Sequence, residues 1–446
     1  MTADRPTMVN GFDDSRTDSL PAGTRDKIRR RHAALGPAYR LFYDDPVELV
    51  RGSGTYLYDA EGNEYLDAYN NVPCVGHAHP RIVEAVHAQM GILNTNTRYL
   101  QESILDYAEQ LLSTFPAELG NAIFTCTGSE ANDLALRVAH YVTGNQGIIV
   151  TANAYHGVTS AVAAISPSLG ENSPLGANVR VVAAPDIRCA GGDLNEYMRT
   201  QTTAAIADLR RHGYGLAAFV ADSIFSSDGV FAGPPGFLAP ILDEVHRAGG
   251  LYIADEVQPG FGRTGDGWWG FARHGIVPDI ATLGKPMGNG IPIAAAIFRP
   301  ELLANFGRQI RYFNTFGGNT VSIAAAKAVL DVIGDEHLID NAAHVGHQLV
   351  TGLRDSARIT DQIGDIRGTG LFIGVDVVTG QGEHTPDPKT AARIVNTLRA
   401  RRVLISASGP NGNVLKVRPP MAFRAADANR FLEAFHQVII DVANTP

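Results

Sequence analysis

Short apolar runs alternate with longer helical segments between about residue 120 and residue 298. The runs are AIFTCT, GIIVTA, VRVVAAP, LAAFVAD, LYIADE, DIATLG and IAAAIF. Strands that are apolar on both faces, with helices between them, are typical of a mostly parallel sheet that is covered on both sides. The pattern therefore predicts an α/β fold for this part of the chain.

The segments on either side of this region show other patterns. Residues 54–69, GTYLYDAEGNEYLDAY, alternate apolar and polar positions around an EGN turn, which predicts a β-hairpin. HPRIVEAVHAQMGIL has helical spacing, with Pro80 in its first turn. From about residue 321 one long helical tract is followed by shorter strands and closing helices, which predicts a smaller α+β domain.

These patterns divide the chain into three parts. We predict an N-terminal arm and small-domain segment over 1–79, a large domain over 80–320 and a C-terminal small domain over 321–446, with residues 1 to about 24 as a loose polar arm. A length of 446 residues suits more than one domain, because single hydrophobic cores stop growing at about 250–300 residues.

Composition narrows the classes of partner and compartment. The formal net charge of −9 disfavours nucleic acid and anionic membranes as partners. Cys74, Cys126 and Cys189 are too few and too widely spaced for a disulfide framework or a zinc cluster, which indicates a reducing compartment. The sequence shows no signal-peptide core and no run of about 18 apolar residues. We expect a cytoplasmic protein that binds neither nucleic acid nor membrane.

One lysine stands in an unusual setting. Lys285 lies between two nearly uncharged apolar stretches in IATLGKPMGNGIPIAAAIF, residues 280–298. Lysine is rarely buried without a partner, because removing its ammonium from water is costly. A covalent bond to the amine would remove this charge.

A strand, a tight turn and a helix follow one another in AIFTCTGSEANDLALRVAHYV. Gly128 and Ser129 stand at the start of the helix, where free N–H groups and the helix dipole favour an anion such as phosphate. Alternatively, Ser129 is only a helix cap. The turn is neither G-x-G-x-x-G nor a Walker loop, which disfavours dinucleotides and nucleoside triphosphates.

Two acids end the apolar strand LYIADE. Asp255 and Glu256 stand at its C-terminal end, where open α/β sheets place ligands. An acid at this place can bind a metal, yet no histidine or cysteine lies beside it at ligand spacing. Alternatively, the acid can hold a proton on a heterocyclic nitrogen. GHAHP offers only His77 and His79 without a third ligand, so we expect no metal site.

Three features together indicate pyridoxal 5′-phosphate as cofactor. They are the helix start at Gly128 and Ser129, which we call the phosphate cup, the acid Asp255 and the lysine Lys285 in its apolar setting. Such a cofactor forms a Schiff base with a lysine, pairs its ring nitrogen with an acid and anchors its phosphate in the cup. An imine also removes the isolated ammonium of Lys285.

The motifs TGSEAN, AYHG, ADEVQPGFGRTG, TLGKPMGNG and FNTFGGN, in this order and at these spacings, resemble the class III family of pyridoxal-phosphate-dependent aminotransferases. The similarity runs from about residue 30 to residue 440. It implies fold type I of the aspartate aminotransferase superfamily, with a mostly parallel seven-stranded sheet in the large domain and a smaller α+β domain. It also implies a homodimer with shared active sites.

The resemblance assigns roles by matching position. Lys285 would form the Schiff base and Asp255 would keep the ring nitrogen protonated, so these two are the expected catalytic residues. The other cofactor contacts would be Val257 packed on the ring, Tyr155 stacked on its opposite face beside His156, Gln258 near the 3′-oxygen, Gly128 and Ser129 at the phosphate, and Thr315 added from the other subunit.

The substrate-binding residues are harder to assign. Where family members acting on amino acids commonly have Arg-x-x-Pro-Pro, this chain has VLKVRPP, so Lys416 replaces that arginine. Residues i and i+2 of a strand share a face, so Lys416 and Arg418 would present two cations together. Such a pair suits a phosphate or a carboxylate. Alternatively, Lys416 is an ordinary exposed strand lysine. Asp222 replaces the usual glutamate after the AAFVA strand, and Asn71 is expected at the substrate entrance.

Three functions follow from the same cofactor site. YNNVPCVGHAHP, LNTNTRYL and IGDIRGTGLFIG resemble the branch that holds alanine–glyoxylate-type aminotransferases and the ethanolamine-phosphate and hydroxylysine-phosphate phospho-lyases. We rank first an aminotransferase that moves an amino group from an amine or amino acid to a 2-oxo acid, because this activity is commoner in the family. A phospho-lyase acting on a phosphorylated amine such as phosphoethanolamine is the close alternative. A non-catalytic pyridoxal-phosphate-binding protein is the third.

Overall fold

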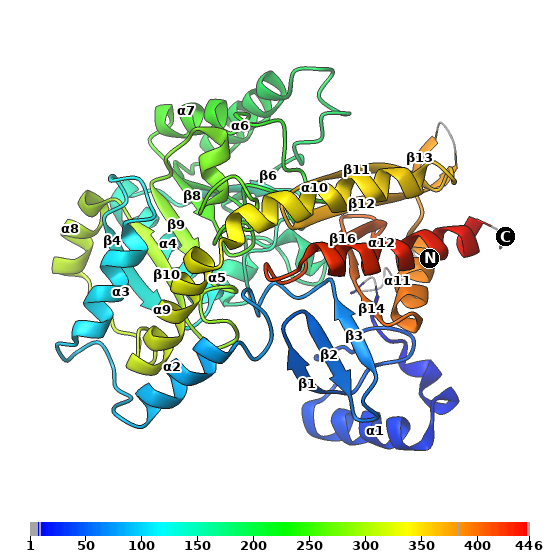
Figure 1. The fold of residues 1–446 in the computed structure, drawn as a ribbon. Helices are drawn as coiled ribbons and strands as arrows, with labels where there is room; N and C mark the ends of the chain where they lie inside the picture. Colours follow the sequence, from blue (N-terminus) through cyan, green and yellow to red (C-terminus); the bar gives the residue numbers. More distant parts are fainter. Residues whose placement is uncertain (1–7, 9, 381–382, 444–446) are drawn as a thin grey trace.

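The computed structural model describes residues 8, 10–380 and 383–443. Its main feature is a seven-stranded sheet (Figure 1) in which only β10 runs antiparallel to its neighbours. In spatial order the strands are β4 (Asn121–Thr125), β10 (Ala294–Phe298), β9 (Ile280–Leu283), β8 (Leu251–Asp255), β7 (Leu216–Ala221), β5 (Gly147–Thr151) and β6 (Val179–Val182). All seven apolar runs form strands, so the predicted α/β fold is confirmed.

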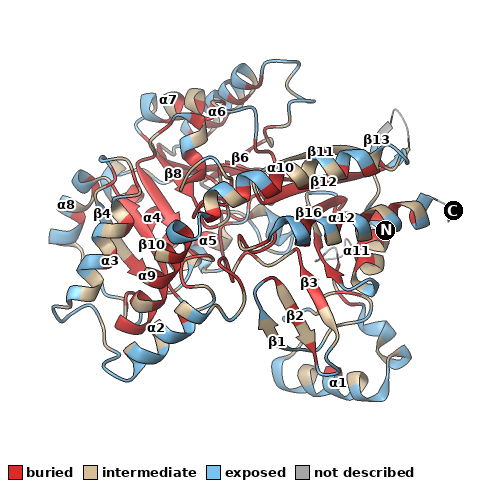
Figure 2. Ribbon diagram, viewed as in Figure 1, coloured by how far each residue is buried: buried red, intermediate tan, exposed pale blue. Residues whose placement is uncertain are grey.

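Both faces of this sheet are buried, as Figure 2 shows by the red strands beneath the paler helices. Successive residues of one strand belong to different apolar clusters: Ile148 packs in one and Ile149 in the other. The helices and turns around the sheet are α2 (Pro80–Met90), α3 (Glu102–Leu112), α4 (Gly128–Thr143), α5 (Ser160–Ala163), η2 (Pro167–Leu169), α6 (Leu194–Arg211), α7 (Ala239–Arg247), η3 (Gly270–His274) and α8 (Pro300–Gln309). This double covering explains why the strands lack polar alternation.

Two smaller sheets lie beside the large one (Figure 1). The first has the order β1 (Leu49–Ser53), β2 (Tyr56–Asp59), β3 (Glu64–Asp67), β14 (Val403–Leu404), and β2 and β3 form the predicted hairpin. The second has the order β11 (Ile363–Thr369), β12 (Phe372–Gly380), β16 (Val414–Val417), β15 (Ser406–Ser408), with β13 (Glu383–Pro386) on β12. The surrounding helices are η1 (Asp14–Ser19), α1 (Ala22–Leu35), α9 (Thr320–Asp335), α10 (Leu338–Ala357), α11 (Pro388–Ala400) and α12 (Ala425–Ala443).

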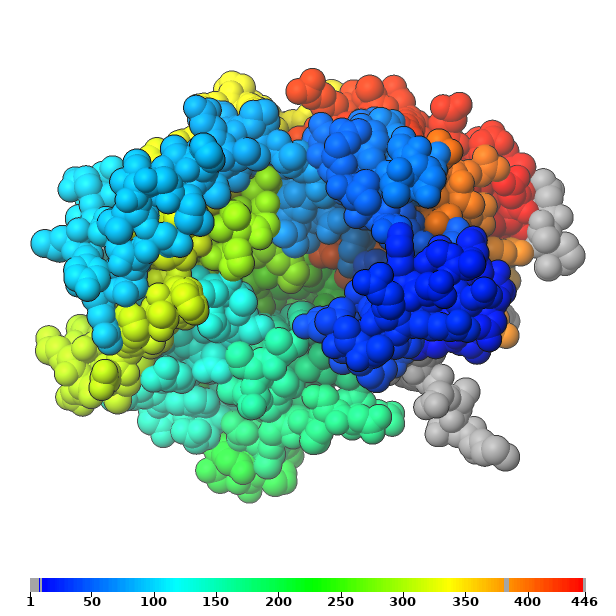
Figure 3. All heavy atoms as spheres, turned by 90° about the horizontal axis from the view of Figure 1, so that it is seen from below, coloured from blue at the N-terminus to red at the C-terminus, as the bar shows by residue number. Residues whose placement is uncertain are grey.

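The N-terminal and C-terminal parts of the chain are packed together. In Figure 3 the dark blue N-terminal segment lies against orange and red C-terminal elements. Asn10 accepts a hydrogen bond from Ser406 at 2.9 Å, and Tyr43 donates to the carbonyl of Ile405 at 3.0 Å. The prediction of a loose arm is therefore wrong for the described residues from Asn10 onward, because Asn10 and Phe12 are buried; residues 1–7 and 9 lie outside the described part.

The long helical tract expected after residue 321 is two helices. α9 ends at Asp335 and α10 begins at Leu338, and His337 between them has the left-handed φ of 53°. Gly334, in the last turn of α9, is the one glycine beside this break, and His337 itself takes the left-handed conformation. The predicted domain boundaries at 79/80 and 320/321 stay predictions.

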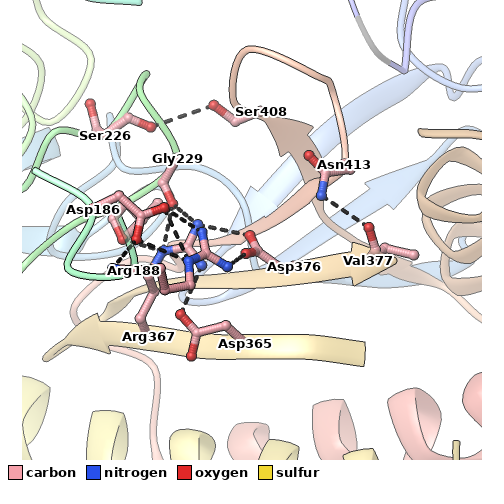
Figure 4. A network of polar contacts seen from close by, with 11 residues as sticks. Asp186, Arg188, Ser226, Gly229, Asp365, Arg367, Asp376, Val377, Ser408 and Asn413 are labelled. Carbon is pink, nitrogen blue, oxygen red and sulfur yellow. Dashed lines mark hydrogen bonds and ion pairs between the residues drawn. The ribbon is translucent and has the colours of Figure 1, made fainter. Parts of the chain in front are cut away.

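A polar network joins the second small sheet to two loops of the large sheet (Figure 4). Arg367 on β11 donates to the carbonyls of Gly229 and Val230 at 2.6 and 2.9 Å and to Asp376 at 2.8 Å. Arg188, in the loop after β6, donates to the other oxygen of Asp376 at 2.9 Å. The loop that follows β7 is thereby fixed to the small sheet.

None of the helices in the described residues is long and apolar enough to cross a membrane.

Candidate active site

A cavity of about 280 Å³ opens at the C-terminal ends of the central strands of the large sheet. Parallel strands bring their C-terminal ends to one edge, so residues distant in sequence meet there. Most of the predicted site residues line this cavity: Gly128, Ser129, Tyr155, His156, Asp222, Asp255, Val257, Gln258 and Lys285.

One end of the cavity is formed by the first turn of α4. Thr127 caps the helix through a capping box with Glu130, which leaves the next residues, Gly128 and Ser129, at the cavity wall. A Cβ on Gly128 would lie 2.9 Å from Val257, so only glycine lets this wall come so close. Gly157 likewise approaches Ser129, where a Cβ would lie 2.3 Å from the hydroxyl. A backbone cradle at a helix N-terminus fits a phosphate group.

The acid end of the cavity is formed by Asp255 at the end of β8. Its Oδ1 accepts a hydrogen bond from the amide of Val257 at 3.1 Å. Its Oδ2 accepts from Nδ2 of Asn132 at 3.1 Å and lies 2.7 Å from Nδ1 of His156. All these groups are buried, so the carboxylate is held in one orientation. His156 thus contacts the acid, and Asn132 is a site residue that the sequence patterns did not identify.

Lys285 follows β9 and lines the same cavity. Burial, with the nearby Arg418, lowers the pKa of its amine to about 8, while Asp255 and Asp222 oppose this change. About a tenth of the amine is therefore unprotonated at pH 7, far more than for an ordinary lysine, and a nucleophile or proton acceptor must be unprotonated.

Gln258 connects the cavity to two residues outside its lining. Its Oε1 accepts hydrogen bonds from Nδ2 of Asn71 and from Nη1 of Arg418, each at 2.7 Å. With Oε1 occupied twice, Nε2 is the group of Gln258 that remains to donate toward a ligand. The structure thus places Asn71 and Arg418 beside the cavity through Gln258.

Lys416 lies on β16, opposite Gly374 of β12. Burial, Arg418 and Lys285 together lower the pKa of its amine to about 7. Within the described part of the chain, its Nζ makes no hydrogen bond and no ion pair. The expected alternative of an exposed strand lysine is wrong, because Lys416 is half-buried.

Asp222 lines the cavity but is bonded within its own loop. Its carboxylate accepts hydrogen bonds from the amide and hydroxyl of Ser226, at 3.0 and 2.6 Å, and from the amide of Ile224 at 2.9 Å. Burial raises the pKa of Asp222, and the charge of Asp255 acts in the same direction. Glu256 points away, accepting from the amides of Gly270 and Phe271 and from Ser223, which makes it a structural residue.

Tyr155 and Thr315 lie apart from the buried set. Tyr155 lines the cavity with 38% of its surface exposed. Thr315 is exposed and borders a second hollow, of about 410 Å³, formed with Phe316 and the outer face of α4. Within one chain the structure therefore does not bring Thr315 to the cavity.

The two histidines of GHAHP contact different acids. His77 lies 2.7 Å from Asp67, and His79 lies 3.1 Å from Glu336. Across the described residues, no group of three or more histidine, cysteine or acidic side chains is arranged to hold a metal ion.

The sequence model of the family described as "Aminotransferase class-III" matches residues 43–439. The chain belongs to the class III aminotransferase family. Pyridoxal phosphate is therefore its cofactor, and the glycine cradle, the oriented acid and the lysine of lowered pKa fit this group.

The similar proteins within the class III family include both aminotransferases and phospho-lyases. An "Alanine--glyoxylate aminotransferase 2-like" protein of Drosophila melanogaster is 40% identical over 434 residues, 93% of this chain and 87% of that protein. The "Ethanolamine-phosphate phospho-lyase homolog 1" of Caenorhabditis elegans is 36% identical, covering 97% and 98%. The solved structure of a phospholyase from Arthrobacter in complex with phosphoethanolamine is 43% identical, with a TM-score of 0.91 over 94% of this chain and 100% of that one.

Proposed function

We propose that this class III enzyme is a phospho-lyase that releases phosphate and ammonia from a small O-phosphorylated amine such as phosphoethanolamine. The main support is that two cations, Lys416 and Arg418, form no ion pair with a carboxylate among the described residues. Lys416 makes no ion pair with the described residues, and Arg418 bonds to the neutral Gln258. Arg418 is buried and Lys416 is half-buried. Charges withdrawn from water are normally paired, so these two cations suit an anionic group on the substrate.

The charge of Asp222 raises the pKa of Lys416, but no ion pair joins these two described residues. Both oxygens of Asp222 accept hydrogen bonds from Ser226, and one also accepts from Ile224. A phosphate offers several acceptor oxygens to two cations, the ammonium of Lys416 on β16 and the guanidinium of Arg418 just after that strand. The similarity to the Arthrobacter phospholyase, whose structure holds phosphoethanolamine, supports the same choice.

The residues of the chain divide the chemistry among them. When bound, pyridoxal phosphate supplies an aldehyde that joins the substrate amine and a ring that accepts electrons. Gly128 and Ser129 would hold its phosphate, and Asp255 would hold a proton on its ring nitrogen. Nζ of Lys285 would take a proton from the substrate carbon next to nitrogen, a transfer that contributes about 10²–10⁴ in rate. The C–O bond would then break, with its electron pair leaving on phosphate. Water would convert the remainder to an aldehyde and ammonia.

The functional unit in this proposal is a homodimer. Large apolar side chains are exposed together near the start of α9: Leu100 is 98% exposed and Phe316 is 69% exposed. The two segments that carry them are in contact, since Arg98 lies over the ring of Phe313 at 3.6 Å. A second copy that covers this face would bring its Thr315 toward the exposed first turn of α4.

One pair of assays tests the proposal. The holoenzyme is incubated with phosphoethanolamine, and phosphate and aldehyde are measured. In parallel it is incubated with ethanolamine or other amines plus pyruvate, and alanine is measured. Release of phosphate with equal aldehyde supports the lyase. Alanine without phosphate would overturn it in favour of an aminotransferase, and absence of both products would indicate the non-catalytic function.

Aminotransferase activity is the second candidate. The same two cations suit the carboxylate of an amino acid or a 2-oxo acid, and the Drosophila relative at 40% identity carries an aminotransferase name. The sequence ranked this activity first because it is commoner in the family. The similarity to the Arthrobacter phospholyase, at 43% identity with phosphoethanolamine in its structure, favours the lyase.

A further inference from the structure

Asn132 is a buried amide on α4 whose hydrogen-bonding groups are all directed at the site. Its Nδ2 donates to Oδ2 of Asp255 at 3.1 Å and to the carbonyl of His156 at 2.8 Å. Its Oδ1 accepts a hydrogen bond from the hydroxyl of Thr282 at 2.7 Å. Only 1% of Asn132 is exposed, so water does not compete for these bonds.

The partners fix which end of the amide faces the acid. A carbonyl oxygen can only accept, so the group that contacts His156 must be the NH₂. The Thr282 hydroxyl completes this arrangement by donating to Oδ1 from β9. Asp255 therefore meets a donor whose direction is set by a strand, β9 with Thr282, and by the loop that carries His156, and not by Asn132 alone.

The place of Asn132 in the chain adds a second constraint. It lies four residues after Gly128, one turn further along α4, so both lie on the same face of one helix. The first turn of α4 forms the glycine cradle, and the next turn holds the acid. The separation between the two ends of the cavity is thus set by a single helix.

We propose that Asn132 is a positioning residue that keeps the carboxylate of Asp255 at a fixed distance and direction from the phosphate cradle. This rests on the proposed role of Asp255 at the ring nitrogen. Without Asn132, Oδ2 of Asp255 keeps one side-chain partner, His156, and the carboxylate gains freedom to turn. The carbonyl of His156 would also lose its buried donor.

A double-mutant cycle on cofactor affinity tests this. Apoenzyme of the wild type, Asn132→Ala, Asp255→Ala and the double variant is titrated with pyridoxal phosphate. We expect Asn132→Ala to weaken binding about ten- to hundredfold, the range for loss of a hydrogen bond to a charged group. In the Asp255→Ala background the same change should cost less than about threefold, since coupled residues give non-additive effects.

Variants of Thr282 test the same hydrogen bonds if Asn132→Ala folds poorly. Thr282→Val removes the hydroxyl that anchors the amide, and Thr282→Ser retains it, so only the first should weaken cofactor binding. Asn341→Ala is the matched control, because Asn341 also donates to two carbonyls, those of Met421 and Phe423, in the small domain. It should lower the melting temperature without changing cofactor affinity.

The outcomes separate the two proposals. Equal losses for Asn132→Ala in both backgrounds would show a structural role only and overturn this inference. If Asp255→Ala binds the cofactor as tightly as the wild type and keeps its turnover, the proposed role of Asp255 fails, and the inference fails with it. An effect of Asp255→Ala with coupling to Asn132 supports both.

Discussion

Arg418 of the small domain donates a hydrogen bond of 2.7 Å to Oε1 of Gln258, which follows β8 of the large sheet. The guanidinium also lies over the ring of Tyr69, 4.5 Å from its centroid. These contacts hold a cation beside the cavity from two directions. The side of the cavity at Gln258 is therefore supported by both domains, whereas the glycine cradle and Asp255 belong to the large sheet and α4.

Replacing the lysine of the cavity tests the central assignment. Lys285→Ala should lose turnover by more than about 10²–10⁴, because one amine both captures the cofactor and transfers the proton. Borohydride treatment and peptide mapping of the wild type should find the cofactor attached at residue 285. Lys327→Ala is the control, since Lys327 only pairs with Asp331 on the surface of α9. Substantial activity in Lys285→Ala would contradict the assignment.

The lowered pKa of Lys285 predicts how cofactor capture depends on pH. Burial brings this pKa to about 8, and only the unprotonated amine reacts with an aldehyde. The rate at which apoenzyme takes up pyridoxal phosphate should thus rise about tenfold from pH 7 to pH 9 and then level off. Stopped-flow absorbance measures this rate. A rate that still climbs steeply at pH 10 would show an ordinary lysine.

The charge of Lys416 should govern the choice of substrate. Lys416→Met removes the ammonium at similar length, and we expect about a ten- to hundredfold loss of kcat/KM for phosphoethanolamine. The value for an uncharged amine should change little, and Lys416→Arg should restore most of the loss. Because the pKa of Lys416 is lowered to about 7, inhibition by inorganic phosphate should weaken as pH rises through 7 in the wild type but not in Lys416→Met. Equal losses for both substrates would show that Lys416 only supports β16.

Subunit mixing tests whether active sites are shared. Lys285→Ala and Thr315→Arg chains are each expected to be inactive. If Thr315 serves the neighbouring site, a mixed dimer holds one intact site, and refolding the two together should restore about a quarter of wild-type activity. If Thr315 acts within its own chain, mixing restores nothing. Light scattering checks that the active species is a dimer.

The sequence sufficed for those features that depend on local pattern. Seven apolar runs gave seven strands, and the residues at the ends of β8 and β9, Asp255 and Lys285, were found because strand ends are recognisable. Ligands gather at such ends in any parallel sheet. These assignments needed no knowledge of which strands are neighbours.

Other features depend on packing between distant segments. Asn132 resembles any polar residue of an amphipathic helix, and its role arises only when β8 and β9 come to lie beside α4. The break at His337 is left-handed at a histidine, not at a glycine, although Gly334 stands three residues before it. The bonding of Asp222 to Ser226 was likewise invisible, because it depends on the fold of a single irregular loop.

The Arg367 network has a consequence for protein engineering. Arg367 belongs to the small sheet and is held there by Asp376, yet it donates to the carbonyls of Gly229 and Val230. These carbonyls lie in the loop whose first residue, Asp222, forms part of the cavity wall. A chimera that takes residues 363–417 from a relative would leave this loop with foreign partners. Residues 183–193 and 222–232 must therefore be exchanged together with the small sheet, as one recombination block, if the wall of the cavity is to keep its shape.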